Sequence, residues 1–215
     1  FGASIILVPT GNGRELLLAG QKSGMVHALD PDSRGAIVWQ SRAGKGGVLG
    51  GIQWGMAADT SQVYAAVSDV VIAPPKPSPS SVSPVLDKNQ GGGLTAFRIA
   101  DGSKVWFAPP PDCPGEATRC SPAQSAALTA IPGAVLSGSL DGHLRAFSTA
   151  DGTRLWDFDT VRDYDAVNGV KGRGGSLDGP GPVIANGMLY VNSGYSRFGG
   201  MPGNVLLAFT ADNSR

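Results

Sequence analysis

The chain has 215 residues, of which 32 are glycine, 16 are proline and 16% are charged, and its formal net charge is zero. A neutral chain lacks the basic patch with which proteins bind nucleic acid or anionic membranes, so we expect neither partner. No apolar run approaches the ~20 residues that cross a bilayer, which predicts no membrane span. Glycine and proline in these amounts are typical of many short strands joined by tight turns, and they predict an all-β fold.

One hairpin motif recurs along the chain. It reads Gly, an alternating strand with a central Ala, a turn that contains Gly, and a return strand that ends in Trp, and this alternation is typical of paired β-strands. The copies occupy residues 24–39, 93–106 and 142–156, and a fourth begins at residue 204. A period of about 50 residues with insertions predicts a β-propeller with one four-stranded antiparallel blade per repeat. We expect each tryptophan to pack between neighbouring blades.

In chain order the pattern predicts four blades, at about residues 1–45, 46–108, 121–160 and 175–215, with insertions at 69–92, 109–123 and 159–176. The expected strands are 3–8, 15–19, 25–30 and 37–40; 51–57, 62–67, 94–98 and 104–107; 125–130, 134–139, 143–148 and 154–158; 181–184, 188–192 and 205–210. The fourth copy stops before its tryptophan, and the chain opens directly in a strand. We therefore expect it to be about four blades, the C-terminal piece, of a longer propeller.

Two insertions offer alternatives to a plain connection. Residues 69–92 contain five prolines and several serines. This composition predicts a long surface loop, which either covers the blades or binds a partner. Residues 159–177 are rich in glycine and charge, and they form either a solvated loop or a loop at the mouth of the propeller where a substrate is bound.

The two cysteines, Cys113 and Cys120, lie in the proline-rich insertion between the second and third blades. Six intervening residues do not match a close Cys-x-x-Cys metal pair, and only two histidines are present to complete a zinc site, so we predict no metal ligands. A loop disulfide, formed in an oxidising compartment, is the interpretation we favour over free thiols. We interpret His27 and His143 as occupying the same place in their repeats, beside the residue that starts the strand, and this shared position favours structural roles over catalysis.

Several stretches outside the repeat are also distinctive. They are Leu-Ala-Gly-Gln-Lys-Ser-Gly at 18–24, Gly-Gly-Ile-Gln-Trp-Gly at 50–55, Cys-Ser-Pro-Ala-Gln-Ser-Ala at 120–126, Leu-Asp-Gly-Pro-Gly-Pro at 177–182, Asn-Ser-Gly-Tyr at 192–195 and Phe-Gly-Gly-Met-Pro-Gly-Asn at 198–204. Together with the Trp-ended hairpins, they resemble the quinoprotein alcohol dehydrogenases, and within them the polyvinyl-alcohol dehydrogenase branch. The resemblance covers essentially the whole chain, which would then be the last four of eight blades.

The resemblance implies a periplasmic or secreted enzyme that oxidises secondary alcohol groups. Pyrroloquinoline quinone (PQQ), held beside a calcium ion on the propeller axis, would take the equivalent of a hydride from the alcohol and pass electrons to a cytochrome c. The cofactor supplies this redox chemistry, while the protein orients it.

The same resemblance assigns five cofactor-binding residues. Lys22 stands where a basic residue reaches the quinone oxygens, and a cation there would stabilise charge that develops on reduction. Gln53 and Trp54 match an Asn-Trp pair along the edge of the cofactor, with Gln in place of Asn. Gly174 and Gly175 match positions where a close approach to the cofactor favours glycine. The structural alternatives are a turn lysine at Lys22 and a core tryptophan at Trp54.

The resemblance also implies what this chain lacks. It places the catalytic carboxylate just upstream of Phe1 and the calcium ligands in earlier blades. We therefore expect no catalytic residue in this chain, we expect the missing N-terminal half as its partner, and we expect the piece to be inactive alone. Two other hypotheses remain: a non-catalytic propeller scaffold, and an extracellular binding module in which residues 69–92 and 159–177 grip a polymer or a protein.

Overall fold

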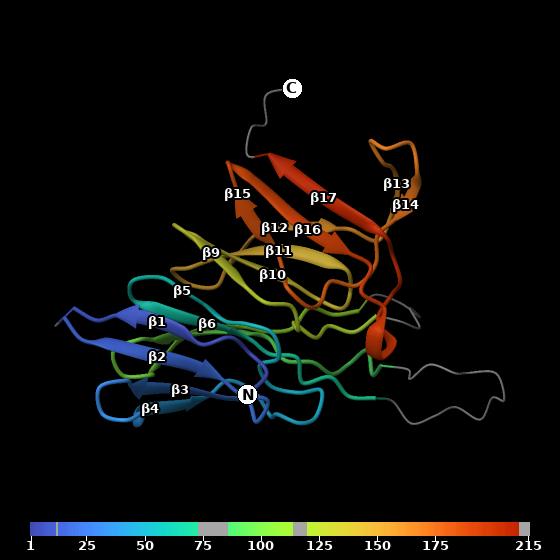
Figure 1. The fold of residues 1–215 in the computed structure, drawn as a ribbon. Coiled ribbons are helices and arrows are strands. Elements are labelled where there is room, and N and C mark those ends of the chain that lie inside the picture. The colour runs from blue at the N-terminus through green and yellow to red at the C-terminus, as the bar shows by residue number, and fades with distance from the viewer. Residues whose placement is uncertain (12, 73–85, 114–119, 211–215) are drawn as a thin grey trace.

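The structure, a computed structural model, describes residues 1–11, 13–72, 86–113 and 120–210. Within these residues it is built from antiparallel strands, and the one helix is a single 3-10 turn, η1 (Arg197–Gly199). Four sheets follow one another along the molecule, from the N-terminal sheet at the bottom of Figure 1 to the C-terminal sheet at the top. The all-β prediction is confirmed.

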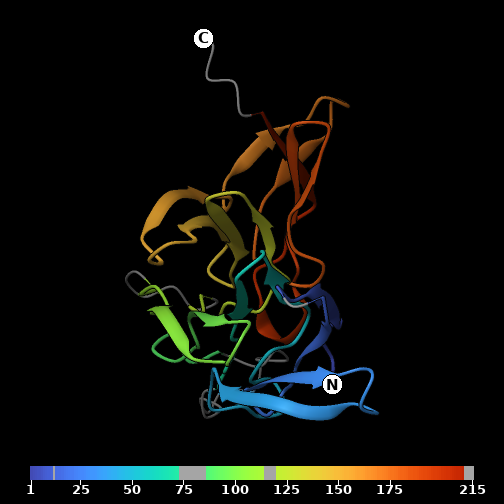
Figure 2. The same ribbon diagram turned by 90° about the vertical axis from the view of Figure 1, so that its left-hand side faces the viewer.

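The first two sheets each have four strands in sequential order. The first contains β1 (Ile6–Pro9), β2 (Glu15–Gly20), β3 (Met25–Asp30) and β4 (Ala36–Arg42). The second contains β5 (Ala57–Ala58), β6 (Gln62–Ala66), β7 (Leu94–Arg98) and β8 (Lys104–Ala108). Figure 2 shows the sheets from the side, again with the first at the bottom.

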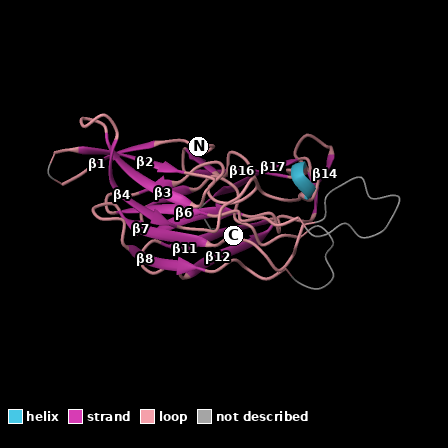
Figure 3. Ribbon diagram, turned by 90° about the horizontal axis from the view of Figure 1, so that it is seen from below, coloured by secondary structure: helices cyan, strands magenta, loops and turns pink. Residues whose placement is uncertain are grey.

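The third sheet repeats this pattern, and the fourth stops at three strands. The third contains β9 (Thr129–Ile131), β10 (Ala134–Gly138), β11 (His143–Ser148) and β12 (Arg154–Asp159). The fourth contains β15 (Val183–Ala185), β16 (Met188–Ser193) and β17 (Val205–Thr210). Seen from below, the strands of successive sheets run side by side across the molecule, and η1 lies at one end of them (Figure 3).

The repeated hairpin has the same register in the first three sheets. Its alanine lies opposite its tryptophan, and a β-bulge follows directly after the alanine in every copy. The pairs are Ala28 with Trp39, Ala96 with Trp106, and Ala146 with Trp156. This register shows that the expectation of a shared place for the two histidines is wrong, because His27 directly precedes Ala28, as Arg145 precedes Ala146, whereas His143 lies three residues before Ala146.

Two of the tryptophans join neighbouring sheets, as expected. Trp39 belongs to an apolar cluster that also contains Val26 of the first sheet and Phe97 of the second. Trp106 is in the next cluster, which runs from Tyr64 in the second sheet to Val135 in the third. The hydrophobic core is therefore a series of layers between sheets.

The structure departs from the expected strands at two places. The first strand of each sheet is shorter than predicted, and of the seven residues expected at 51–57 only Ala57 lies in β5. Within 159–177, expected as a loop, the chain forms a two-stranded hairpin, β13 (Asp163–Asp165) and β14 (Lys171–Arg173). None of the described residues belongs to a helix with the length and hydrophobicity needed to span a bilayer.

Candidate functional site

The first strands of the sheets converge on one line through the molecule. β1 lies beside β5, and β5 lies beside β9. The N–H of Ser4 donates to the carbonyl of Trp54 (3.4 Å), and the N–H of Ala127 donates to the carbonyl of Gly179 (3.0 Å). Residues just before these strands therefore come from all four sheets and lie near one another, as they do around the axis of a propeller.

The structure places Lys22 next to the Gln53–Trp54 pair. Gly2 lies between them, because a Cβ built on Gly2 would be 3.1 Å from the carbonyl oxygen of Gln53 and 3.4 Å from Cε of Lys22. The Lys22 side chain is exposed, and its ammonium donates to the carbonyl of Val48 at 3.1 Å. An ammonium has three donors, so two remain for a ligand.

A glycine-rich loop, residues 44–51, holds Lys22 in place. Its conformation depends on Asp69, which has a φ of 43°. Three backbone N–H groups of the loop donate to the Asp69 carboxylate, those of Lys45 (2.6 Å), Gly46 (3.0 Å) and Gly51 (2.8 Å). The N–H of Gly47 then donates to the carbonyl of Lys22 at 3.0 Å. The backbone of Lys22, which lies in the turn closed by the N–H of Gly24 and the carbonyl of Gln21, is therefore held by this loop, and the turn-lysine alternative stays open.

Gln53 directs its amide nitrogen toward the protein. Nε2 donates to the carbonyl of Leu49 (2.6 Å) and to the hydroxyl of Ser68 (3.1 Å). Both amide hydrogens are used in these bonds, and only the amide oxygen is left for a ligand. In the family pattern an Asn at this position contacts the edge of the cofactor. For Gln53 this contact stays a prediction.

Trp54 is not a core residue. Its exposed fraction is 39%, against 8% for Trp39 and 7% for Trp106. Its ring meets the ring of Tyr195 edge to face, with centroids 6.3 Å apart and an interplanar angle of 77°. An exposed indole is suited to a planar ligand, because the ring offers a stacking face. A lysine close to the neighbouring Gln53 would add charge for an anionic one.

Asp178 lies next to Trp54 and was not among the residues expected from the sequence. Its Oδ1 accepts hydrogen bonds from the Ser125 hydroxyl (2.7 Å) and the Gly179 N–H (2.8 Å). Burial raises the pKa of Asp178, and the hydrogen bonds to its carboxylate only partly oppose this rise. The sequence signal that could have identified Asp178 is its place in the distinctive Leu-Asp-Gly-Pro stretch.

Gly174 and Gly175 have a packing explanation. A Cβ on Gly174 would lie 1.8 Å from the carbonyl oxygen of Thr160, and one on Gly175 would lie 2.4 Å from that of Met201. The N–H of Gly175 donates to the hydroxyl of Ser193 at 2.8 Å. Close approach of the chain to itself therefore accounts for both glycines, and their contact with a cofactor remains a prediction.

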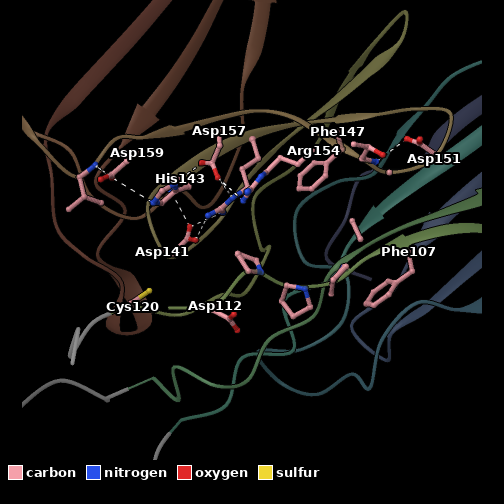
Figure 4. Close-up of a pocket in the computed structure, with 18 of the residues that line it drawn as sticks. Phe107, Asp112, Cys120, Asp141, His143, Phe147, Asp151, Arg154, Asp157 and Asp159 are labelled. Carbon is pink, nitrogen blue, oxygen red and sulfur yellow. Dashed lines mark hydrogen bonds and ion pairs between the residues drawn. The ribbon is translucent and has the colours of Figure 1, made fainter. Parts of the chain in front are cut away.

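A large groove lies elsewhere, between the segment after β8 and the strands β11 and β12 (Figure 4). It has a volume of about 890 Å³, and Phe107 and Phe147 form part of its wall. Its ionic groups are bonded to one another: Nδ1 of His143 lies 2.6 Å from Oδ1 of Asp157, and Arg145 pairs with Asp141 at 2.6 Å. Burial opposes ionisation of Asp157, but His143 and Arg145 hold its pKa below the usual value. These residues have a structural role.

Cys113 and Cys120 form a disulfide, with Cα atoms 5.9 Å apart. No three His, Cys, Asp or Glu side chains of the described ranges gather as metal ligands do. The calcium ligands expected upstream of Phe1 stay a prediction. Residues 73–85, most of the insertion for which partner binding was the alternative, lie outside the described residues.

Comparison with known proteins extends these observations. A family profile described as outer membrane protein assembly factor BamB, of the PQQ-repeat type, matches residues 22–161. A polyvinylalcohol dehydrogenase of a Pseudomonas species is 44% identical over 98% of the chain, which spans 33% of that relative. The quinohemoprotein alcohol dehydrogenase of Comamonas testosteroni is similar in fold, with a TM-score of 0.58 at 16% identity over 98% of this chain and 33% of that one. BamB from Moraxella catarrhalis is also similar in fold, with a TM-score of 0.56 at 19% identity over 97% of this chain and 46% of that one.

Bulged, Trp-ended hairpins in successive four-stranded sheets, together with these similarities in fold, define a β-propeller of the quinoprotein type. The chain belongs to the PQQ-repeat family that includes BamB. Its resemblance to the quinoprotein alcohol dehydrogenases, and to polyvinylalcohol dehydrogenase in particular, is confirmed. It spans about a third of the length of the curated relatives it matches.

Proposed function

We propose that this chain is part of a PQQ-dependent dehydrogenase that oxidises secondary alcohol groups, such as those of polyvinyl alcohol, and passes electrons to a cytochrome c. The observation that carries this proposal is the exposed Trp54 where the sheets converge, with Lys22 close to the backbone of the adjacent Gln53, in a chain 44% identical to a polyvinylalcohol dehydrogenase. When bound, PQQ would supply the redox chemistry by accepting the equivalent of a hydride from the alcohol.

The described residues fit the cofactor in their chemistry. PQQ is planar, aromatic and anionic, so a half-exposed indole and a lysine with free donors are complementary to it. Lys22 would bind oxygen atoms of the quinone and stabilise negative charge there. Trp54 would bind the plane or the edge of the ring system and exclude water from that side. Gln53 would offer its amide oxygen.

The remaining functional assignments are part of the same proposal. The catalytic carboxylate and the calcium ligands would belong to segments outside this sequence, and so the 215-residue chain alone is expected to be inactive. The Cys113–Cys120 disulfide supports an oxidising location, the periplasm or the exterior of the cell.

The test is a titration of PQQ, with calcium, into the full-length protein that contains this chain. We expect Lys22→Ala and Trp54→Ala each to weaken binding at least about tenfold, as the loss of a charged hydrogen bond or a buried aromatic contact does. The matched controls are Lys171→Ala, whose side chain is 85% exposed, and Trp156→Ala, which lies in β12 away from the convergence. Both controls should bind as the wild type does.

The second candidate function is a propeller scaffold that binds no quinone. It is supported by the family profile and by the similarity in fold to BamB from Moraxella catarrhalis. The same titration decides between the two, because a folded full-length protein that binds no PQQ would overturn the dehydrogenase proposal and favour the scaffold.

A further inference from the structure

The glycine-rich loop of residues 44–51 holds two of the expected cofactor contacts through consecutive carbonyl groups. The carbonyl of Val48 accepts a hydrogen bond from the Lys22 ammonium at 3.1 Å. The carbonyl of Leu49 accepts one from the Gln53 side-chain amide at 2.6 Å. The position of this one loop therefore determines where both polar side chains point.

The loop also binds the backbone of the turn that carries Lys22. The N–H of Gly47 donates to the carbonyl of Lys22 at 3.0 Å. The loop and the turn are in close contact, because a Cβ built on Gly46 would lie 2.5 Å from the carbonyl group of Ser23. A displacement of the loop would therefore move the backbone of Lys22 as well as its side chain.

Asp69, which follows β6 in the second sheet, closes this loop with one carboxylate. Its Oδ2 accepts a hydrogen bond from the N–H of Lys45 at 2.6 Å. Its Oδ1 accepts two, from the N–H groups of Gly46 (3.0 Å) and Gly51 (2.8 Å). Hydrogen bonds to a charged acceptor are among the stronger ones in proteins, and these three join the two ends of the loop.

We propose that Asp69 is a positioning residue, which orients Lys22 and Gln53 toward PQQ through the loop of residues 44–51. This role rests on the function proposed above. Asp69 acts through the two side chains, so its removal is expected to weaken cofactor binding only as far as Lys22 and Gln53 themselves contribute to that binding.

The structural alternative is that Asp69 only shapes the connection between the first and second sheets. On that alternative its loss would lower stability, and any effect on PQQ affinity would be the same with and without the polar groups of Lys22 and Gln53. The two roles are separated by a mutant cycle, which isolates the coupling between side chains.

The experiment measures how much Asp69→Asn changes the dissociation constant of PQQ, with calcium, in two full-length backgrounds: the wild type and Lys22→Met/Gln53→Leu. Asn tolerates the φ of 43° at residue 69 as Asp does, but its side chain has one acceptor oxygen in place of two and no charge. Met and Leu keep apolar bulk without the polar ends. We expect Asp69→Asn to weaken binding about tenfold in the wild type, the size of effect of one hydrogen bond to a charged group, and less than about twofold in the other background.

The matched control is Asp30→Asn. Asp30 is the last residue of β3, at the opposite end of that strand from the turn of Lys22. Its carboxylate also accepts hydrogen bonds from two backbone N–H groups, those of Asp32 (2.9 Å) and Ser33 (3.2 Å). Asp30→Asn removes a similar set of bonds away from the site, and it should leave PQQ affinity unchanged in both backgrounds.

A second measurement covers the case in which Asp69→Asn does not fold. Coupling is reciprocal, so if the loop orients the cofactor contacts, bound PQQ must stabilise the loop. In the wild type, saturating PQQ should slow hydrogen exchange of the N–H groups that bind Asp69 by about fivefold or more. In Lys22→Met/Gln53→Leu the change should be less than about twofold at saturation. The N–H groups of Asp32 and Ser33, which bind Asp30, are the internal control for a general effect on stability.

The outcomes are distinct. If the wild type binds PQQ, but Asp69→Asn binds normally or weakens binding equally in both backgrounds, the positioning role is wrong and the proposed function stands. Exchange in the loop that PQQ slows equally in both backgrounds also overturns the role, as does a Lys22→Met/Gln53→Leu variant that binds PQQ as the wild type does. If the folded wild type binds no PQQ, the proposed function fails, and the role fails with it.

Discussion

The indole nitrogen of Trp39 donates a hydrogen bond to the carbonyl oxygen of Ile99, 2.7 Å away in the next sheet. The bond is repeated one sheet further on, where Trp106 donates to the carbonyl of Thr149 at 2.9 Å. Ile99 and Thr149 occupy the same place in their repeats, three residues after the alanine. The recurring tryptophan therefore connects the first sheet to the second and the second to the third.

Trp39→Phe should destabilise the chain by about 1–3 kcal/mol, because it removes this hydrogen bond and leaves the Ile99 carbonyl without its donor. Trp156→Phe is the matched control, since Trp156 is 36% exposed. Urea unfolding monitored by circular dichroism measures both. Equal losses for the two variants would contradict a special role of the Trp39 bond.

The turn glycine of the next hairpin, between β7 and β8, is needed for two reasons. Gly102 has a φ of 72°, and a Cβ there would lie 2.5 Å from the Trp39 ring. Gly35 has a φ of 75°, but nothing lies within 4 Å of a Cβ built on it. Gly35→Ala should therefore cost about 1 kcal/mol of backbone strain, whereas Gly102→Ala should cost clearly more because the tryptophan must also move. Thermal unfolding of the two variants measures both losses of stability. Gly35→Ala reports backbone strain alone, and Gly102→Ala reports strain together with the clash against the Trp39 ring.

The sequence predicted the repeating part of the fold well. The alternation around Ala28, Ala96 and Ala146 indicates which residues pair, and the Asp-Gly turns of the second and third copies indicate where the chain reverses. The first strands were overestimated because residues 51–56 have the composition of a strand but face the convergence, where loops and neighbouring sheets replace ladder partners. The β13–β14 hairpin was missed because its charged, glycine-containing residues lack the alternation of a half-buried strand.

The candidate site was only partly predictable. Lys22 and Gln53 could be named from the resemblance, and the structure brings the Lys22 side chain and the Gln53 carbonyl together around Gly2. Asp69 and Asp178 could not be named, because their importance lies in which backbone and side-chain donors they meet. Those donors are far away in the sequence: Asp69 binds residues 45, 46 and 51, and Asp178 binds Ser125, 53 residues earlier.

Arg145 is the residue whose loss should harm stability most in the groove of Figure 4. Its guanidinium is buried and pairs with Asp141, which is also buried, at 2.6 Å. Arg145→Met would leave the Asp141 carboxylate buried without its partner, at a cost of about 3–5 kcal/mol. Arg154→Met, which removes a 57% exposed guanidinium that pairs with Asp157, should cost less than about 1 kcal/mol. A small loss for Arg145→Met in urea unfolding would show that water or another donor replaces the pair.

Asp178 should make stability depend on pH in a direction opposite to that of most acids. Burial raises its pKa in the folded chain, so between the ordinary value of 3.8 and the raised value the folded state holds more protons than the unfolded state. The stability that Asp178 contributes by binding this proton is present in full below pH 3.8 and is lost as the pH rises through the pKa of the folded state.

Compared with Asp178→Asn, the wild type should therefore gain unfolding free energy as the pH falls from 7 toward 4. Asp59 gives the opposite control. Burial opposes its ionisation, but hydrogen bonds from Tyr64 and Ser61 lower its pKa on balance. The stability that Asp59 contributes is present above 3.8 and is lost as the pH falls through its folded pKa. Urea unfolding of wild type, Asp178→Asn and Asp59→Asn over this pH range measures both effects, and parallel curves for wild type and Asp178→Asn would show that Asp178 titrates alike in both states.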